Sequence, residues 1–162
     1  MKILIVYYSR TGMNEKLAKI LQEKLDCEME KIEEFEDRRG ILGFLKSGMQ
    51  SVMKKRTEIK PTKYDPADYD IVIVVSPVWA GFIPPPMRTY LHNFREKFKK
   101  LAYASVSYSG YGNSKVLKDL EALTFKKVES HLLLKEKEMK SPLYNEKVKL
   151  FIERNIKSLN EL

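Results

Sequence analysis

Residues 1–14 read MKILIVYYSRTGMN, and the pattern in this stretch decides the fold. An apolar run rich in β-branched residues predicts a buried strand over residues 2–8. The hydroxyl- and glycine-bearing residues 9–12 then lead directly into a helix predicted from about Met13 to Leu25. A strand, a tight turn and a helix N-terminus in succession can bind phosphate, because free backbone N–H groups and the helix dipole meet there.

The alternation of strand and helix continues along the whole chain. Further strands are predicted at about 27–32, 71–75, 101–108 and 127–134, and further helices at about 40–55, 84–98, 114–123 and 141–159. This order implies a parallel sheet with helices on both faces. The loops after Tyr8, Val75 and Tyr108 then meet at the carboxyl edge of the sheet, where such folds bind ligands.

Composition indicates a soluble protein with one domain over residues 1–162. The chain has 43% hydrophobic and 32% charged residues, and no apolar run approaches the roughly 20 residues that cross a bilayer. Cys27 is the single cysteine, which excludes an intrachain disulfide and, with the absence of a signal-peptide pattern, predicts a cytoplasmic protein. The sequence shows no metal-binding spacing.

The net charge of +8 is concentrated in one segment. Residues 38–63 carry eight basic residues against one acid, Glu58, and are interpreted as a basic insertion. The helix predicted at 40–55 is amphipathic, and we expect its apolar face to pack on the domain. A dimer contact and a cover over the ligand site are the alternatives for this helix. Positive charge of this kind attracts anions in general, without choosing among them.

Three loops resemble those of the flavodoxin-like family. Ser9-x-Thr11-Gly12-x-Asn14 resembles the phosphate loop usually written [ST]-x-T-G-x-[TN]. Pro77-Val78-Trp79-Ala80-Gly81 resembles the second flavin-contacting loop, and Ser109-Gly110-Tyr111-Gly112-Asn113 resembles the third. The resemblance covers the whole chain and implies an α/β three-layer sandwich whose five-stranded parallel sheet has the order 2-1-3-4-5. Residues 40–48 are also similar to the insertion of a less characterised subgroup, the flavodoxin-family proteins.

The resemblance implies FMN as the cofactor and gives each loop a role. The first loop would wrap the 5′-phosphate, the second would lie against the isoalloxazine, and the third would bond its pyrimidine end. A backbone N–H of Ala80 or Gly81 would donate to flavin N5, Arg10 would point to solvent, and either Tyr108 or Tyr111 would contact the ring. The implied cofactor-binding residues are Ser9, Arg10, Thr11, Gly12, Met13, Asn14, Pro77, Val78, Trp79, Ala80, Gly81, Ser109, Gly110, Tyr111 and Gly112.

Because the flavin carries the chemistry, no catalytic side chain is expected. His92 and His131 have no serine or cysteine partner in readable range. The first function hypothesis is an oxidoreductase that passes electrons from NAD(P)H or a reduced partner protein to a quinone-like or protein acceptor. The alternative is a flavodoxin-type one-electron carrier, and a nucleic-acid-binding module rests only on the charge. We expect no nucleic-acid partner and no membrane span, and we leave a homodimer open.

Overall fold

The chain's structure, a computed structural model, describes residues 1–35, 40–109 and 113–160. The strands are β1 (Ile3–Tyr7), β2 (Glu28–Lys31), β3 (Ile71–Val75), β4 (Leu101–Ser107) and β5 (Val128–Lys135). The α-helices are α1 (Met13–Leu25), α2 (Gly40–Val52), α3 (Pro85–Phe94), α4 (Asn113–Thr124) and α5 (Leu143–Asn160), and two short 3-10 helices are η1 (Pro66–Asp68) and η2 (Glu138–Lys140).

The five strands form one parallel sheet in the order β2-β1-β3-β4-β5, which confirms the predicted topology. β1 and β3 lie in register from Ile3 opposite Ile71 to Tyr7 opposite Val75. Both strands are buried along their full length. The loops after β1, β3 and β4 therefore leave the sheet at the same edge, where we expected the ligand site.

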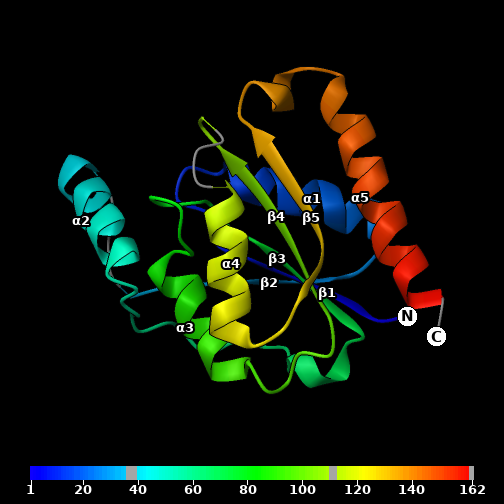
Figure 1. Cartoon of the computed structure of the whole chain (residues 1–162), viewed down its shortest axis with the longest axis horizontal. Helices are drawn as coiled ribbons and strands as arrows, with labels where there is room; N and C mark the ends of the chain where they lie inside the picture. Colours follow the sequence, from blue (N-terminus) through cyan, green and yellow to red (C-terminus); the bar gives the residue numbers. More distant parts are fainter. Residues whose placement is uncertain (36–39, 110–112, 161–162) are drawn as a thin grey trace.

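The sheet separates two apolar layers, and this confirms the three-layer architecture. Ile3, Ile5 and Tyr7 point into one layer, which includes side chains of α1 and α5. Leu4 and Val6 point into the other layer, which includes side chains of α3 and α4. Figure 1 shows α3 and α4 on the viewer's side of the sheet and α1 behind it. Alternate residues of one buried strand thus supply two cores.

α3 is shorter than predicted. The sequence suggested a helix through Phe98, because Tyr90, Phe94 and Phe98 share helical spacing. The helix ends at Phe94, and the Lys97 amide then bonds the Phe94 carbonyl at 2.8 Å in a tight turn. Phe98 is 2% exposed and lies with its ring centroid 6.3 Å from that of Tyr90. Phe98 is therefore buried from the loop after α3 and not from the helix. The helical spacing of the aromatic residues made the predicted helix too long.

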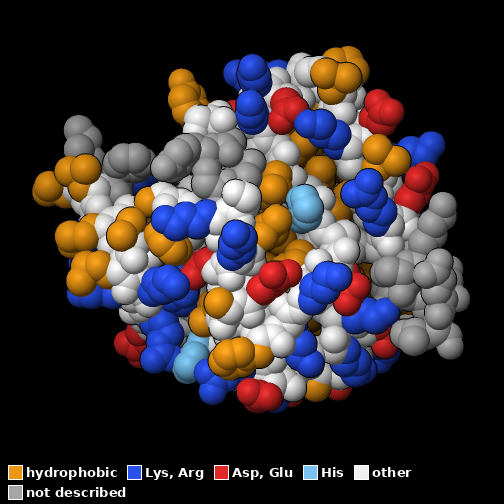
Figure 2. Space-filling model, viewed as in Figure 1, with side chains coloured by type: hydrophobic (Ala, Val, Ile, Leu, Met, Phe, Trp, Pro, Cys, Tyr) orange, Lys and Arg blue, Asp and Glu red, His pale blue; other side chains and the backbone are white. Residues whose placement is uncertain are grey.

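The expectation that the apolar face of α2 packs on the domain is wrong. Five large side chains of α2 and the residue after it are between 53% and 83% exposed, namely Leu42, Leu45, Met49, Val52 and Met53. Ser47 and Ser51 are buried instead. In Figure 1, α2 stands at the far side of α3 from the sheet, and Figure 2 shows apolar side chains covering that end of the molecule. Small side chains allow the helix to approach the body on the side opposite its apolar stripe.

Within the described parts of the chain, no helix has the length and apolarity needed to cross a membrane.

Candidate functional site

A cavity of about 420 Å³ opens at the carboxyl edge of the sheet. All three predicted loops contribute to its wall, and the predicted residues that line it are Arg10, Val78, Trp79, Ala80 and Ser109. Arg10 was expected to point to solvent and is exposed, yet it borders this cavity. A larger cavity of about 620 Å³ lies at the opposite edge, beside Cys27 and Tyr69, and receives none of the three loops.

The first loop presents the N-terminus of α1. Gly12 caps the helix with φ of 88°, a left-handed conformation that glycine adopts without strain, and its carbonyl accepts from the Lys16 amide at 2.9 Å. The Ser9 hydroxyl accepts from the Gly12 amide at 3.0 Å. Among the described residues no side chain caps α1. The amides of its first turn, which begins at Met13, therefore remain available for an anion.

One carboxylate, Glu15, shares that first turn with the predicted anion site. Lys19, one turn further along α1, lies 2.7 Å from the Glu15 carboxylate. The hydrogen bond from Lys19 lowers the pKa of Glu15. The pair compensates the negative charge locally, so the helix terminus can still accept a phosphate.

Asn14 has a role that its motif position did not reveal. Its side chain is 3% exposed; the amide donates to the Val106 carbonyl at 3.0 Å and the oxygen accepts from the Val106 amide at 2.9 Å. These bonds extend the hydrogen-bond ladder of β4 past the last rung from β3, the Ser76 amide to the Ala104 carbonyl. The carboxamide ties the first loop to the strand before the third loop, and any contact of Asn14 with a ligand falls to its backbone.

The second loop is a tight turn built on two left-handed residues. The amides of Trp79 and Phe82 each donate to the carbonyl of the other, at 3.1 and 3.0 Å. Between them Ala80 and Gly81 have φ of 52° and 87°, the signature of a type I′ turn. The amides of these two central residues take no part in the paired bonds, which leaves them free to face a ligand.

Trp79 closes one side of the cavity and is half-buried. Its ring meets Tyr8, the residue after β1, edge to face with a centroid distance of 5.7 Å. The Tyr8 hydroxyl in turn donates to Glu34 at 2.7 Å. Pro77 and Val78 are also half-buried and lead from β3 into this wall. An aromatic wall of this kind suits a planar ring system.

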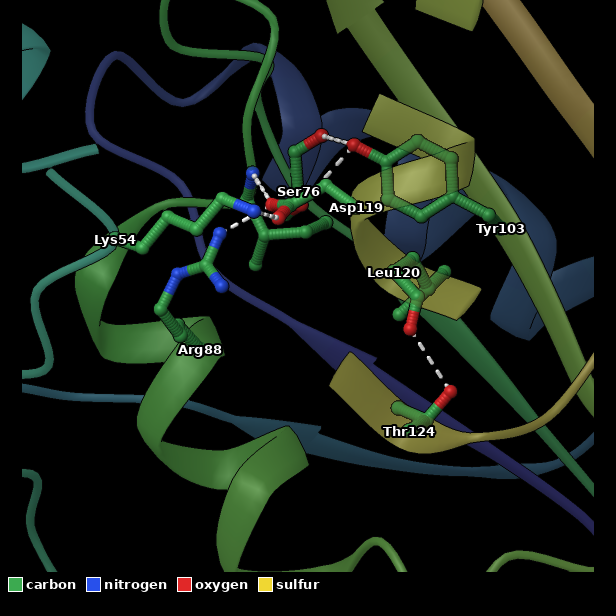
Figure 3. Close-up of polar contacts among 8 residues, drawn as sticks. Lys54, Ser76, Arg88, Tyr103, Asp119, Leu120 and Thr124 are labelled. Carbon is green, nitrogen blue, oxygen red and sulfur yellow. Dashed lines mark hydrogen bonds and ion pairs between the residues drawn. The ribbon is translucent and has the colours of Figure 1, made fainter. Parts of the chain in front are cut away.

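Polar contacts behind the second loop fix its start. The Tyr103 hydroxyl on β4 donates to the Ser76 carbonyl at 3.1 Å and lies 3.2 Å from the Ser76 hydroxyl (Figure 3). Burial of the phenol raises the pKa of Tyr103 to about 12, so it stays a neutral donor. Ser76, the residue after β3, is thereby held at the point where the chain enters the loop.

The third loop is described as far as Ser109. Ser107, Tyr108 and Ser109 line the cavity, and Tyr108 is 86% exposed. Gly110, Tyr111 and Gly112 lie outside the described residues. Of the two tyrosines left open by the sequence, Tyr108 borders the cavity, and Tyr111 lies outside the described residues.

α2 supplies a wall that no motif predicted. Ser47 and Gly48 line the cavity together with the loops. Ser47 is 3% exposed and its hydroxyl donates to the Gly43 carbonyl at 2.5 Å. A serine and a glycine inside an amphipathic helix give no chemical signal, although a cover over the ligand site was one of the alternatives left open for this helix.

The fold and the site define a class of protein, the flavodoxin-like FMN flavoproteins. Residues 1–147 match the NADPH-dependent FMN reductase family, and the chain belongs to this family. Family membership makes the protein an FMN-binding redox flavoprotein. Among curated proteins, none matches the chain.

Solved structures with the same fold support this assignment of the architecture. A flavoprotein in complex with FMN from Lactobacillus acidophilus is 22% identical, with a TM-score of 0.72, over 82% of this chain and 92% of that one. A putative flavoprotein from Bacteroides eggerthii is 22% identical, with a TM-score of 0.70, over 86% and 94%. Oxidised flavodoxin 2 from Bacillus cereus is 17% identical, with a TM-score of 0.57, over 97% and 99%.

Proposed function

We propose that FMN lies in the 420 Å³ cavity with its phosphate on the N-terminus of α1, and that the protein transfers electrons from NAD(P)H to a quinone-like or protein acceptor. The observation that carries the proposal is the meeting of three separate loops and α2 around one cavity, beside a helix terminus that no described side chain caps. Cavities of this size enclose small molecules. Membership in an NADPH-dependent family supports the nicotinamide donor.

The chain's own groups would hold and orient the cofactor. The amides from Met13 to Glu15 and the hydroxyl of Thr11 are the proposed phosphate donors, since both the free amides and the helix dipole favour an anion. The amides of Ala80 and Gly81 would donate to the ring edge, and Trp79 and Tyr108 would exclude water from its sides. The remaining loop residues predicted from sequence, with Gly110, Tyr111 and Gly112 among them, stay part of this proposed site.

When bound, the flavin supplies the redox chemistry by accepting hydride or single electrons. The protein adds a positive field, because Arg10 borders the cavity and the net charge of the chain is +8. Such a field favours a negatively charged reduced cofactor and attracts the phosphates of a nicotinamide dinucleotide. This reaction, together with the single cysteine, fits a cytoplasmic site of action.

Rapid mixing of the FMN-loaded protein with NADPH and with NADH tests the function. We expect the visible flavin absorption to bleach in a single two-electron step, faster with NADPH, and to return when a quinone is added. Bleaching that needs an added reductase and proceeds in two resolved one-electron steps would instead identify a one-electron carrier.

We also propose that the protein is a homodimer joined through the apolar face of α2. Leu42, Leu45, Met49, Val52 and Met53 are each more than half exposed on one helix and its end, and a contiguous exposed apolar patch marks an interaction surface. α2 contains no acidic residue, so two copies of this face can meet in a two-fold contact that buries no carboxylate from the helix. Light scattering should give a dimer mass for the wild type and a monomer mass for Leu45→Glu/Met49→Glu. A wild-type monomer at high protein concentration would contradict the proposal.

A further inference from the structure

A buried carboxylate, Asp119 of α4, lies directly behind the second loop. Its side chain is 3% exposed, yet it contacts three separate segments of the chain (Figure 3). A buried carboxylate is costly unless charged and hydrogen-bonding partners surround it. Its partners therefore show which parts of the molecule the carboxylate holds in place.

The first segment is the second loop itself. The Ile83 amide donates to Asp119 Oδ2 at 3.0 Å, and Ile83 follows the turn from Trp79 to Phe82 directly. Arg88 of α3, which is 4% exposed, donates to the same carboxylate oxygen. Asp119 thus fixes the position of Ile83, where the chain passes from the turn to α3. It thereby also positions the turn relative to the cavity.

After the second loop and α3, the third segment is the chain that follows α2. Lys54 Nζ lies 3.6 Å from Asp119 Oδ1 and 5.6 Å from the centroid of the Phe82 ring. Lys54 has φ of 52°, a left-handed conformation that turns the chain just after the helix. Its side chain remains 55% exposed, unlike that of Asp119. The ion pair therefore joins α2 to the element that holds the second loop.

This ion pair matters because it ties the chain just after α2 to the body of the protein, close to the cavity that α2 lines. The helix turns its apolar face away from the body, and Ser47 and Ser51 are its buried side chains among those that the structure describes. A second tether follows in Thr57, whose amide donates to the Thr89 hydroxyl at 3.1 Å and whose carbonyl accepts from it at 2.6 Å. Ser47 and Gly48 of α2 line the same cavity as the second loop.

We infer that Asp119 is a positioning residue for the flavin site, which sets the second loop through Ile83 and holds α2 against the cavity through Lys54. The inference rests on the proposed FMN site. Neither Asp119 nor Lys54 lines the cavity, so both act through the second loop and α2, which do. Lys54 is the contact that can be removed without burying an unpaired charge.

Three lysine variants test the inference with a site-specific reporter. Trp79 is the only tryptophan of the sequence and lines the cavity, so its fluorescence reports on the site alone. Lys54→Met keeps the aliphatic stem and removes the ammonium, Lys54→Arg keeps the charge, and Lys55→Met makes the same charge change at the exposed neighbouring residue. FMN binding is measured by quenching of Trp79, and the loop is probed in the apo protein by acrylamide quenching.

We expect Lys54→Met to raise the FMN Kd about three- to tenfold and to make apo Trp79 more accessible to acrylamide. Lys55→Met and Lys54→Arg should match the wild type. In Asp119→Asn, adding Lys54→Met should have no further effect, because the partner is already lost. If Asp119→Asn does not fold, the three lysine variants decide the question alone.

Equal FMN Kd and equal quenching in Lys54→Met and Lys55→Met would overturn the inference, even if Lys54→Met unfolds at a lower temperature. A merely structural ion pair would change the unfolding temperature without changing Trp79. Failure of FMN to quench Trp79 in the wild type is a different result, because it would refute the proposed FMN site and not the role of the Asp119–Lys54 ion pair.

Discussion

Replacing Asn14 by alanine should destabilise the protein far more than an ordinary loop substitution. The Asn14 carboxamide makes two buried hydrogen bonds, to the carbonyl and the amide of Val106. Alanine would leave both backbone groups without a partner at a position where β3 has already ended. An unsatisfied buried polar group costs about 1–3 kcal/mol, so the free energy of unfolding should fall by about 2–4 kcal/mol. For a chain of this size that corresponds to roughly 5–15 °C in Tm.

Urea unfolding of the apo protein, followed by circular dichroism, measures this loss. The apo form is required because bound FMN would add its own stabilisation. Gln22→Ala is the matched control, since Gln22 lies on the same helix and donates one hydrogen bond, to the Cys27 carbonyl at 3.3 Å. This control should lose only about 0.5–1 kcal/mol and keep the FMN affinity of the wild type, because it sits at the far end of α1.

Asn14→Ala should also weaken FMN binding, because the first loop is no longer tied to the strand that precedes the third. A fall of less than about 1 kcal/mol in the free energy of unfolding would show that the two bonds to Val106 do not carry this stability. The expected effect on FMN binding would be refuted if Gln22→Ala weakened FMN binding as much as Asn14→Ala.

Three further predictions follow from single sites. Ala80→Gly should raise the free energy of unfolding by about 0.5–1 kcal/mol, because φ of 52° strains alanine; thermal melts would contradict this if the variant were less stable. Tyr103→Phe should lower it by about 1–2 kcal/mol, measured by urea unfolding, since the Ser76 carbonyl loses its donor; an unchanged midpoint would speak against that bond. Burial, reinforced by Asp26 and Glu28, raises the pKa of Cys27 from 9.0 to about 11. Alkylation at pH 8 should therefore be about 100-fold slower in the folded than in the unfolded protein, and equal rates would refute the shift. Because the pKa of Cys27 is higher in the folded protein, its contribution to the free energy of unfolding is full below pH 9 and is lost as the pH rises through 11.

The sheet and the three loops were predictable because their signals are local. Five consecutive β-branched residues over 71–75 indicate a strand buried on both faces, and the structure places it at the centre of the sheet. The strand, glycine turn and helix in residues 2–25 likewise determine where a phosphate can bind. These patterns depend on neighbours in the sequence and need no knowledge of distant contacts.

The orientation of α2 was not predictable from its pattern. Periodicity shows that Leu42, Leu45 and Met49 share a face, and the usual expectation is that such a face is buried. The structure buries Ser47 and Ser51 instead. Which face of this helix is buried therefore depends on the elements that pack around it, and its own sequence pattern does not give them.

Tertiary contacts also hid the roles of two polar residues. Asp119 stands in the sequence beside Leu120 and Glu121 like any acid of an amphipathic helix, and only the fold brings Ile83 and Arg88 to it. Asn14 occupies a phosphate-loop position, yet its carboxamide is taken by Val106, 92 residues away. The sequence motif locates such a residue, but its role depends on hydrogen bonds to residues that are distant in the sequence.

The most direct test of the account maps FMN onto the chain by NMR. Amide signals of the 162-residue protein would be compared before and after addition of FMN. We predict that the shifted signals cluster at residues 9–15, 78–82 and 107–112, with the indole signal of Trp79 among the largest. Shifts centred on Cys27 and Tyr69, beside the cavity at the opposite edge of the sheet, or no shifts in excess FMN, would contradict it.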